Sequence, residues 1–142
     1  MAGARILLVE DDDVLRSVVE RNLLARGHEV YCAADGQSAL YYLRSQQLDL
    51  ILLDINLPDQ TGWDVLRAVQ AEGSGCYWQD AGLQGKLPVV VLSAVRVSPV
   101  RLAEFHPLAY LPKPFPMDAV LRLAAEAATR REQCAGKEKF HA

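Results

Sequence analysis

The sequence has few cysteines and no long apolar run. Its three cysteines, Cys32, Cys76 and Cys134, are far apart and form no Cys-x-x-Cys pair, which argues against a disulfide framework or a zinc site. No apolar run approaches the roughly 20 residues that cross a bilayer, and the N-terminus has no signal-peptide pattern. These absences predict a cytoplasmic protein with reduced thiols that does not associate with membranes.

Charge of neither sign dominates. The net charge of −3 argues against a nucleic-acid-binding surface, so no direct DNA binding is expected. His28, His106 and His141 are scattered and have no metal-ligand spacing. The composition is instead globular, with 51% hydrophobic residues in a chain of 142, which is long enough for one domain with its own core.

The clearest strand signal lies at residues 48–53. Its apolar residues lead directly into Asp54, and turn residues Pro58 and Gly62 follow. A continuous apolar run bounded by turn signals is typical of a strand buried on both faces. Asp54 would then lie at the carboxyl end of a strand, where open α/β sheets bind their ligands. From this stretch alone, a loop-capping role for Asp54 is an equally good interpretation.

Apolar runs and amphipathic segments alternate five times along the chain. Strands are predicted at residues 5–9, 29–33, 48–53, 88–93 and 108–111, and helices at about 14–26, 35–43, 61–71, 98–105 and 117–131. This alternation predicts an α/β fold with a doubly wound, five-stranded parallel sheet. Residues 1–131 are expected to form one domain, residues 132–142 a short disordered tail, and no effector domain is expected.

The first helix is expected to bury one apolar stripe. Its apolar members are Val14, Leu15, Val18, Val19, Leu23 and Leu24, with a period near 3.6 residues. Asp12 or Asp13 is expected to cap this helix, and its arginines, Arg16, Arg21 and Arg26, are predicted to point outward.

Polar residues of different kinds follow four of the predicted strands. Glu10 and Asp11 follow the first, Asp54 the third, Ser93 ends the fourth, and Lys113 follows the fifth. The carboxyl ends of parallel strands lie along one edge, so these residues should converge. Clustered carboxylates require a cation, and oxygen ligands suit Mg²⁺. A lysine and a hydroxyl beside that ion suit a phosphoryl group, and Asp54 is central enough to be the nucleophile.

These motifs together resemble the receiver domain of two-component response regulators. The resemblance covers roughly residues 5–131 and rests on Leu8-Val9-Glu10-Asp11-Asp12, Leu53-Asp54-Ile55-Asn56-Leu57-Pro58 with Gly62, Val91-Leu92-Ser93-Ala94, and Tyr110-Leu111-Pro112-Lys113-Pro114-Phe115. It implies a flavodoxin-like (βα)5 fold with strand order 2-1-3-4-5.

The resemblance also implies a phosphoacceptor site. Asp54 matches the residue that takes a phosphoryl group from a histidine kinase or a phosphorelay protein. Glu10 and Asp11 match the acidic pair that binds Mg²⁺ together with Asp54 and the backbone carbonyl of Asn56. Lys113 matches the lysine that pairs with the phosphate, and its bond to the following proline is usually cis in this family. Such a domain is a signalling module that takes part in its own Mg²⁺-dependent phosphorylation and dephosphorylation, rather than a conventional enzyme.

Two further positions match the family's conformational switch. Ser93 matches the residue that hydrogen-bonds the phosphoryl oxygen, and Tyr110 matches the aromatic residue that turns inward when phosphate is present. For Tyr110, simple packing at the end of a strand is an equally good interpretation. Phosphorylation of Asp54 would add a doubly anionic group and bias a two-state surface.

The chain departs from the family pattern in three places. Residues 73–86, which include Tyr77 and Trp78, form a longer connection than usual in the family. They suggest either a mobile loop or a contact surface specific to this protein. The segment between Ser93 and Tyr110 is short and carries Pro99 and Pro107, so the family's fourth helix should be brief or distorted. The Gly-Ala pair usual before the last strand is replaced by residues 106–108, His-Pro-Leu.

Three functional classes therefore remain at this stage. The favoured class is a stand-alone, phosphorylatable regulator whose output is a protein contact or a phosphorelay, with an unidentified downstream target. The second is a receiver-like module that binds partners without phosphorylation. The third is a flavodoxin-type enzyme or nucleotide binder, which the absence of a glycine-rich phosphate loop after the first strand disfavours.

Overall fold

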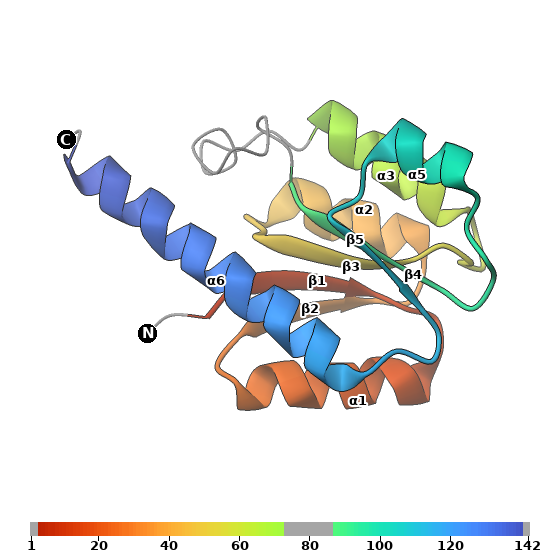
Figure 1. The fold of residues 1–142 in the computed structure, drawn as a ribbon, viewed down its shortest axis with the longest axis horizontal. Coiled ribbons are helices and arrows are strands. Elements are labelled where there is room, and N and C mark those ends of the chain that lie inside the picture. The colour runs from red at the N-terminus through yellow and green to blue at the C-terminus, as the bar shows by residue number, and fades with distance from the viewer. Residues whose placement is uncertain (1–2, 73–86, 141–142) are drawn as a thin grey trace.

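The computed structural model describes residues 3–72 and 87–140, in which strands and helices alternate along the chain (Figure 1). The described strands are β1 (Arg5–Val9), β2 (Glu29–Ala33), β3 (Leu50–Asp54), β4 (Val89–Ser93) and β5 (Ala109–Pro112). The described helices are α1 (Asp13–Ala25), α2 (Gly36–Ser45), α3 (Gly62–Glu72), α5 (Pro99–Phe105) and α6 (Met117–Phe140). The predicted loop or contact surface at residues 73–86 lies outside the described residues.

The strands form one parallel sheet in the order β2-β1-β3-β4-β5. This order confirms the predicted doubly wound fold and places β2 at an edge. Val9 pairs with Leu53, and Ser93 pairs with Pro112. The residues that follow these positions therefore leave the sheet at the same level, which brings Glu10, Asp54 and Lys113 to one edge.

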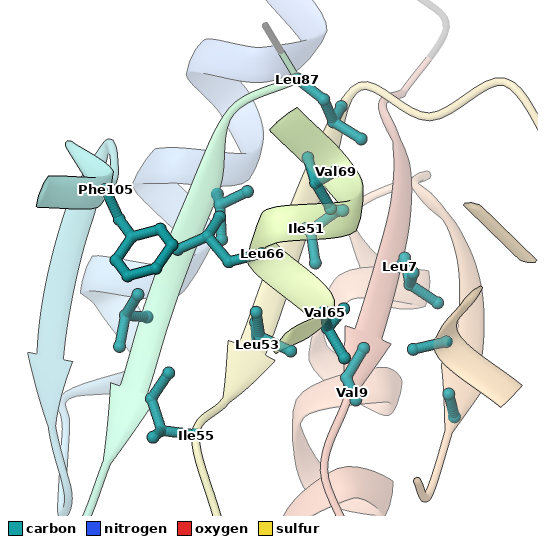
Figure 2. Packing of buried hydrophobic residues seen from close by; sticks show 14 of the residues in the cluster. Leu7, Val9, Ile51, Leu53, Ile55, Val65, Leu66, Val69, Leu87 and Phe105 are labelled. Atoms are coloured by element: carbon teal, nitrogen blue, oxygen red, sulfur yellow. The ribbon is translucent and has the colours of Figure 1, made fainter. Parts of the chain in front are cut away.

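Helices cover both faces of the sheet, with α1 and α6 on one face and α2, α3 and α5 on the other (Figure 1). The three inner strands are buried along almost their whole length. Side chains on the α3 side pack against residues such as Val65, Leu66 and Phe105 (Figure 2). Burying each large aliphatic side chain contributes roughly 2 kcal/mol, so β1, β3 and β4, which lead to Glu10, Asp54 and Ser93, are the most firmly held strands.

Side-chain caps define the start of three of the helices, and Asp12 rather than Asp13 is the cap predicted for α1. Asp12 accepts hydrogen bonds from the backbone N–H groups of Val14 and Leu15, and Asp35 accepts one from Ser38. The side chain of Ser98 caps α5, which has proline at its first position. This helix has only seven residues and ends at His106 in the left-handed region, with φ of 47°. The prediction of a brief fourth family helix is confirmed.

The predicted apolar stripe of α1 is only partly correct. Val19 and Leu23 are buried and Leu15 packs against the core, as residues four positions apart on one helix face should. Val14, Val18 and Leu24 lie outside this line, and these residues are 75%, 44% and 52% exposed. The helix therefore presents a second apolar surface to solvent.

The predicted end of the last helix was too early. The helix continues from Met117 to Phe140, through most of the stretch that was expected to be a disordered tail. Residues 128–139 are mostly alanine, arginine, glutamate, glutamine and lysine, which favour helix, and one interior glycine costs only about 1 kcal/mol. In the described part of the chain, no helix combines the length and hydropathy needed to cross a membrane.

His28 is buried beneath the amino-terminal edge of the sheet. Its Nδ1 accepts a hydrogen bond of 2.9 Å from the backbone N–H of Ala4, which only the neutral ring can do. Burial, together with the nearby Arg26, lowers the pKa of His28 below its usual 6.5. The histidine is therefore a structural residue.

We expect His28 to make folding less favourable in mild acid. Its pKa is lower in the folded state, so the unfolded chain binds the proton more readily. The contribution of His28 to stability is present above about pH 6.5 and declines as the pH falls below that value. Urea denaturation between pH 7 and pH 5 measures the effect.

His28→Asn is the matched control, because an amide oxygen can still accept from Ala4 but does not titrate in this range. Other titrating groups are common to both proteins, so the difference between their pH profiles isolates His28. Parallel profiles for the two proteins would contradict the prediction.

Candidate functional site

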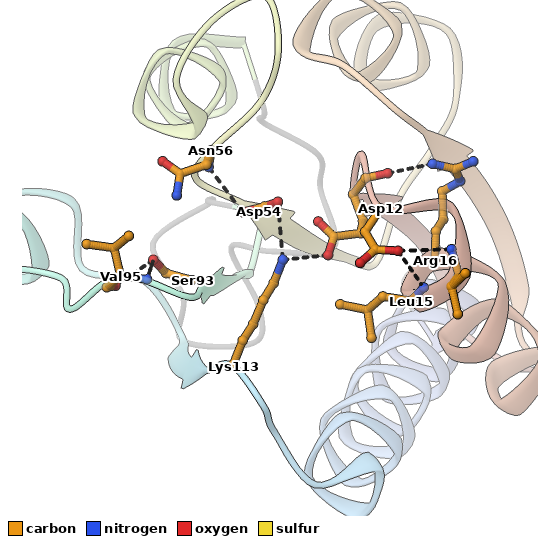
Figure 3. A network of polar contacts seen from close by, with 10 residues as sticks. Asp12, Leu15, Arg16, Asp54, Asn56, Ser93, Val95 and Lys113 are labelled. Atoms are coloured by element: carbon orange, nitrogen blue, oxygen red, sulfur yellow. Dashed lines mark hydrogen bonds and ion pairs between the residues drawn. The ribbon is translucent and has the colours of Figure 1, made fainter.

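The carboxyl edge of the sheet brings together four charged residues predicted from the sequence. Glu10 and Asp11 follow β1, Asp54 ends β3, and Lys113 follows β5. The Lys113 Nζ lies 2.5 Å from Glu10 Oε1 and 3.3 Å from Asp54 Oδ2, and it donates hydrogen bonds to both (Figure 3). Residues 103 positions apart in sequence are thus in direct contact. The peptide bond between Lys113 and Pro114 is cis.

The three carboxylates form a compact acidic cluster. Oxygens of Glu10, Asp11 and Asp54 all lie within 4.8 Å of one another. Glu10 and Asp54 are buried, whereas Asp11 is exposed. The Glu10 Oε2 atom is buried and has no hydrogen-bond partner. Such an orphaned acceptor among oxygen ligands matches the donor set of a hard divalent cation, so this cluster can accommodate Mg²⁺.

Burial and mutual repulsion set the pKa values of this cluster. Burial, and then the neighbouring Asp54, raise the pKa of Glu10 to about 8. Hydrogen bonds from its surroundings, together with the charge of Lys113, hold the pKa of Asp54 below its usual range despite burial. Asp54 is consequently the carboxylate that stays ionised, which is the state a nucleophile needs.

The loop after β3 holds the second oxygen of Asp54. Its Oδ1 accepts a hydrogen bond of 3.0 Å from the backbone N–H of Asn56 (Figure 3). Gly62 lies so close that a Cβ atom there would be 2.6 Å from the carbonyl oxygen of Asp54, so only glycine fits at this position. The predicted ligand atom of Asn56, its backbone carbonyl, belongs to this same loop.

Ser93 is buried at the end of β4, next to the acidic cluster along the sheet edge. Its hydroxyl donates to the carbonyl oxygen of Val95 at 2.6 Å and accepts from the N–H of Val95 (Figure 3). The Tyr110 hydroxyl lies 3.5 Å from the same Val95 carbonyl oxygen. The two predicted switch residues therefore share one backbone acceptor, which their side-chain types alone did not indicate.

Arg16 is a further site residue that the sequence did not reveal. It was predicted to point outward, but its Nη1 donates a 2.7 Å hydrogen bond to the carbonyl oxygen of Glu10 (Figure 3). Its Nη2 pairs with Asp13. The arginine therefore fixes the backbone at the end of β1. In the sequence, only its position about one turn after the acidic run, near the start of α1, could have suggested a contact with the end of β1.

A groove of about 460 Å³ lies beside Lys113, between α1 and the segment from Pro114 to Met117. Its apolar lining includes Val14, Leu15, Val18 and Phe115. The exposed valines of α1 thus border a concave surface that leads to the acidic cluster.

Comparison with known proteins matches this arrangement to one family. The family model described as the response regulator receiver domain matches residues 6–125. The probable transcriptional regulatory protein TcrX of Mycobacterium tuberculosis is 35% identical over 123 residues, which is 84% of this chain and 48% of TcrX. The transcriptional regulatory protein AfsQ1 of Streptomyces coelicolor is 37% identical over 63% of this chain and 34% of its own length. This chain therefore spans about half or less of these two relatives.

Solved structures give the same match. The chemotaxis response regulator CheY4 of Vibrio cholerae is 27% identical with a TM-score of 0.72, covering 89% of this chain and 99% of CheY4. The receiver domain of sensor histidine kinase PA1611 from Pseudomonas aeruginosa is 29% identical with a TM-score of 0.72, covering 90% and 99% of the two chains. That structure has a magnesium ion coordinated in the active-site cleft.

Proposed function

The chain belongs to the response regulator receiver domain family of two-component signalling, and on that premise we propose that Asp54 accepts a phosphoryl group from a histidine kinase or a phosphotransfer protein. The single observation that carries this proposal is the 3.3 Å contact of Lys113 with Asp54 inside the acidic cluster. An ionised carboxylate, a lysine and an unpartnered metal-ligand oxygen at one sheet edge suit phosphoryl transfer better than any other chemistry considered above.

In this proposal a carboxylate oxygen of Asp54 attacks the phosphorus of a phosphohistidine. An oxygen–phosphorus bond forms, the nitrogen–phosphorus bond breaks, and the donor histidine leaves with the electron pair. Glu10, Asp11, Asp54 and the Asn56 carbonyl would hold Mg²⁺, which when bound would offset negative charge on the transferred group. Lys113 supplies a point charge to a phosphoryl oxygen once its bond to Glu10 is released.

Phosphorylation would then reorganise the contacts of Val95. The new phosphoryl group offers three strong acceptors, so the Ser93 hydroxyl turns away from the Val95 carbonyl to donate to one of them. The Tyr110 side chain moves into the space that Ser93 and the loop containing Val95 leave. The change reaches the surface at Val95, a residue that is 62% exposed, and so alters a face that a downstream protein can bind.

The groove beside Lys113 is the proposed approach for the phosphodonor. Val14 and Val18 are exposed apolar side chains at its rim, and an apolar groove of this kind accepts a face of a partner helix. A donor histidine on such a helix would reach the acidic cluster directly.

We expect Mg²⁺ to bind more tightly as the pH rises from about 6.5 to 8. The raised pKa of Glu10, about 8, means that a proton must leave before this carboxylate can bind the ion. Below that pKa, affinity should change by up to about tenfold per pH unit. Titration with magnesium chloride, followed by Trp63 fluorescence in a Trp78→Phe background, measures this dependence.

Beryllofluoride added after Mg²⁺ should then produce a second, saturable change, because it mimics a phosphoryl group on an aspartate. Glu10→Gln should bind Mg²⁺ weakly and without this pH dependence, whereas Asp13→Asn should behave like the wild type. A module that works without phosphorylation would show no beryllofluoride step, and a nucleotide binder would respond to nucleotide instead. Either result would refute the proposal.

A further inference from the structure

The loop that follows Asp54 is closed at its base. The backbone N–H of Gly62 donates to the carbonyl of Ile55 at 2.7 Å, and Asn56 forms an isolated antiparallel bridge with Thr61. These contacts fix the two ends of the loop relative to β3. They do not hold its tip, residues 57–60, which therefore depends on contacts with other elements.

The tip is tied to the first turn of α2 by one side chain. Asp59 Oδ1 accepts a hydrogen bond of 2.8 Å from the N–H of Gly36, and Oδ2 accepts one of 3.0 Å from the N–H of Gln37. These are amides that a helix leaves unpaired at its start. The helix already has its own cap, since Asp35 accepts from Ser38 at 2.7 Å. Asp59 is therefore a second cap supplied from a different segment.

The contact between the two segments is close. A Cβ atom at Gly36 would lie 2.4 Å from Cγ of Gln60, so the backbone of α2 abuts the loop tip. The bonds from Gly36 and Gln37 also lower the pKa of Asp59, and the carboxylate thus stays charged at the positive end of the helix.

We propose that Asp59 is a positioning residue for the metal site, because it clamps the loop that carries the Asn56 carbonyl onto α2. This inference rests on the proposed function, which makes that carbonyl a Mg²⁺ ligand. The hold that α2 exerts on Asp59 reaches Asn56 through the short, closed loop, because Asn56 is bridged to Thr61 and lies three residues from Asp59. A ligand atom in a loop that is held at its base and at its tip loses less conformational freedom when it binds an ion. Outer-shell contacts in other metal sites increase metal affinity in the same way.

A comparison of Asp59→Ala with Asp35→Ala tests this role. Each variant removes a cap from α2 and should lower thermal stability by a similar amount, but only Asp59→Ala releases the loop. We expect Asp59→Ala to weaken Mg²⁺ binding about tenfold, and Asp35→Ala to leave it unchanged. Magnesium chloride titration followed by the NMR shift of the Asn56 amide gives both constants, at a temperature where both variants are folded.

A second measurement needs no metal. Hydrogen exchange of the Asn56 amide, which donates to Asp54, should accelerate in Asp59→Ala but not in Asp35→Ala. Asp59→Asn keeps one acceptor oxygen and should recover part of the affinity. Equal Mg²⁺ constants and equal exchange rates for the two alanine variants would overturn the inference, leaving Asp59 as a helix cap only. A wild-type protein without any Mg²⁺ response would instead refute the proposed function, so the two failures are distinguishable.

Discussion

Replacing Asp54 with asparagine should abolish phosphoryl incorporation from acetyl phosphate and leave the fold intact. The amide has nearly the shape of the carboxylate but lacks its charged nucleophilic oxygen. Asp54 is also one of three clustered carboxylates, so its neutralisation relieves repulsion on Glu10. The variant also loses the ion pair with Lys113, so the two effects oppose each other, and we expect a melting temperature without metal close to that of the wild type. Intact mass spectrometry and thermal denaturation measure the two quantities.

Asp49→Asn is the matched control for this experiment. Asp49 is a buried aspartate that precedes the same strand, but it lies at the opposite edge of the sheet, where it accepts a 2.7 Å hydrogen bond from the Arg5 N–H. Its asparagine variant retains an acceptor and should incorporate phosphate as the wild type does. Labile phosphate retained in Asp54→Asn would rule out Asp54 as the acceptor.

Removal of Mg²⁺ should have an effect of similar size. Without the ion, the acidic cluster repels an anionic phosphodonor, and Lys113 remains paired with Glu10 and Asp54. We expect a chelator to abolish labelling. Asp11→Asn removes a ligand, so labelling of this variant should require Mg²⁺ concentrations at least about tenfold higher than labelling of the wild type. Because Asp11 is exposed, the folded structure should survive the change. Labelling rates over a range of magnesium chloride concentrations measure the shift.

Asp13→Asn separates this effect from a general loss of acidity. Asp13 belongs to the same acidic run, but it pairs with Arg16 and lies outside the acidic cluster. Its Mg²⁺ requirement should match that of the wild type. Undiminished labelling in the presence of chelator, or equal shifts in both variants, would contradict the assignment of Asp11 to the metal.

The site was predictable because it depends on strand ends. Apolar runs identified the strands, and a parallel sheet places their carboxyl ends together whatever their separation in sequence. The sequence pattern therefore predicts that Glu10, Asp54 and Lys113 converge, and the structure places Lys113 in contact with both carboxylates. The metal, phosphoacceptor and switch roles assigned to these residues and to Ser93 stay predictions that the experiments above address.

Contacts made through backbone atoms could not be predicted in this way. Such contacts use the carbonyl of Val95 and the N–H groups of Gly36 and Gln37. Nearly every residue has these backbone groups, so the residue type at a position does not indicate the contact. Asp59 resembled an ordinary turn residue because its partners lie in another element. Tertiary geometry also decided that Arg16 bonds to the backbone of Glu10, although its position on the helix suggested a solvent-facing side chain.

Helix boundaries and exposed apolar residues were the least predictable features of the fold. Periodicity alone assigned Val14, Val18 and Leu24 to the core, because it cannot distinguish a wide buried stripe from a narrow stripe beside a surface groove. The extent of α6 was underestimated because no proline marks its end, and weak sequence signals leave a helix boundary undefined. Disorder was expected for residues 132–142, whereas the helix continues through Phe140. The stand-alone arrangement stays a prediction.

The most direct test of the central claim is to locate the phosphoryl group itself. After treatment with acetyl phosphate and Mg²⁺, an aspartyl phosphate can be reduced with borohydride to homoserine and located by peptide mass spectrometry. Homoserine at position 54, only when Mg²⁺ is present, is the predicted result. Homoserine at any other position, or at none after confirmed Mg²⁺ binding, would contradict the claim that this sheet edge is a phosphoacceptor site.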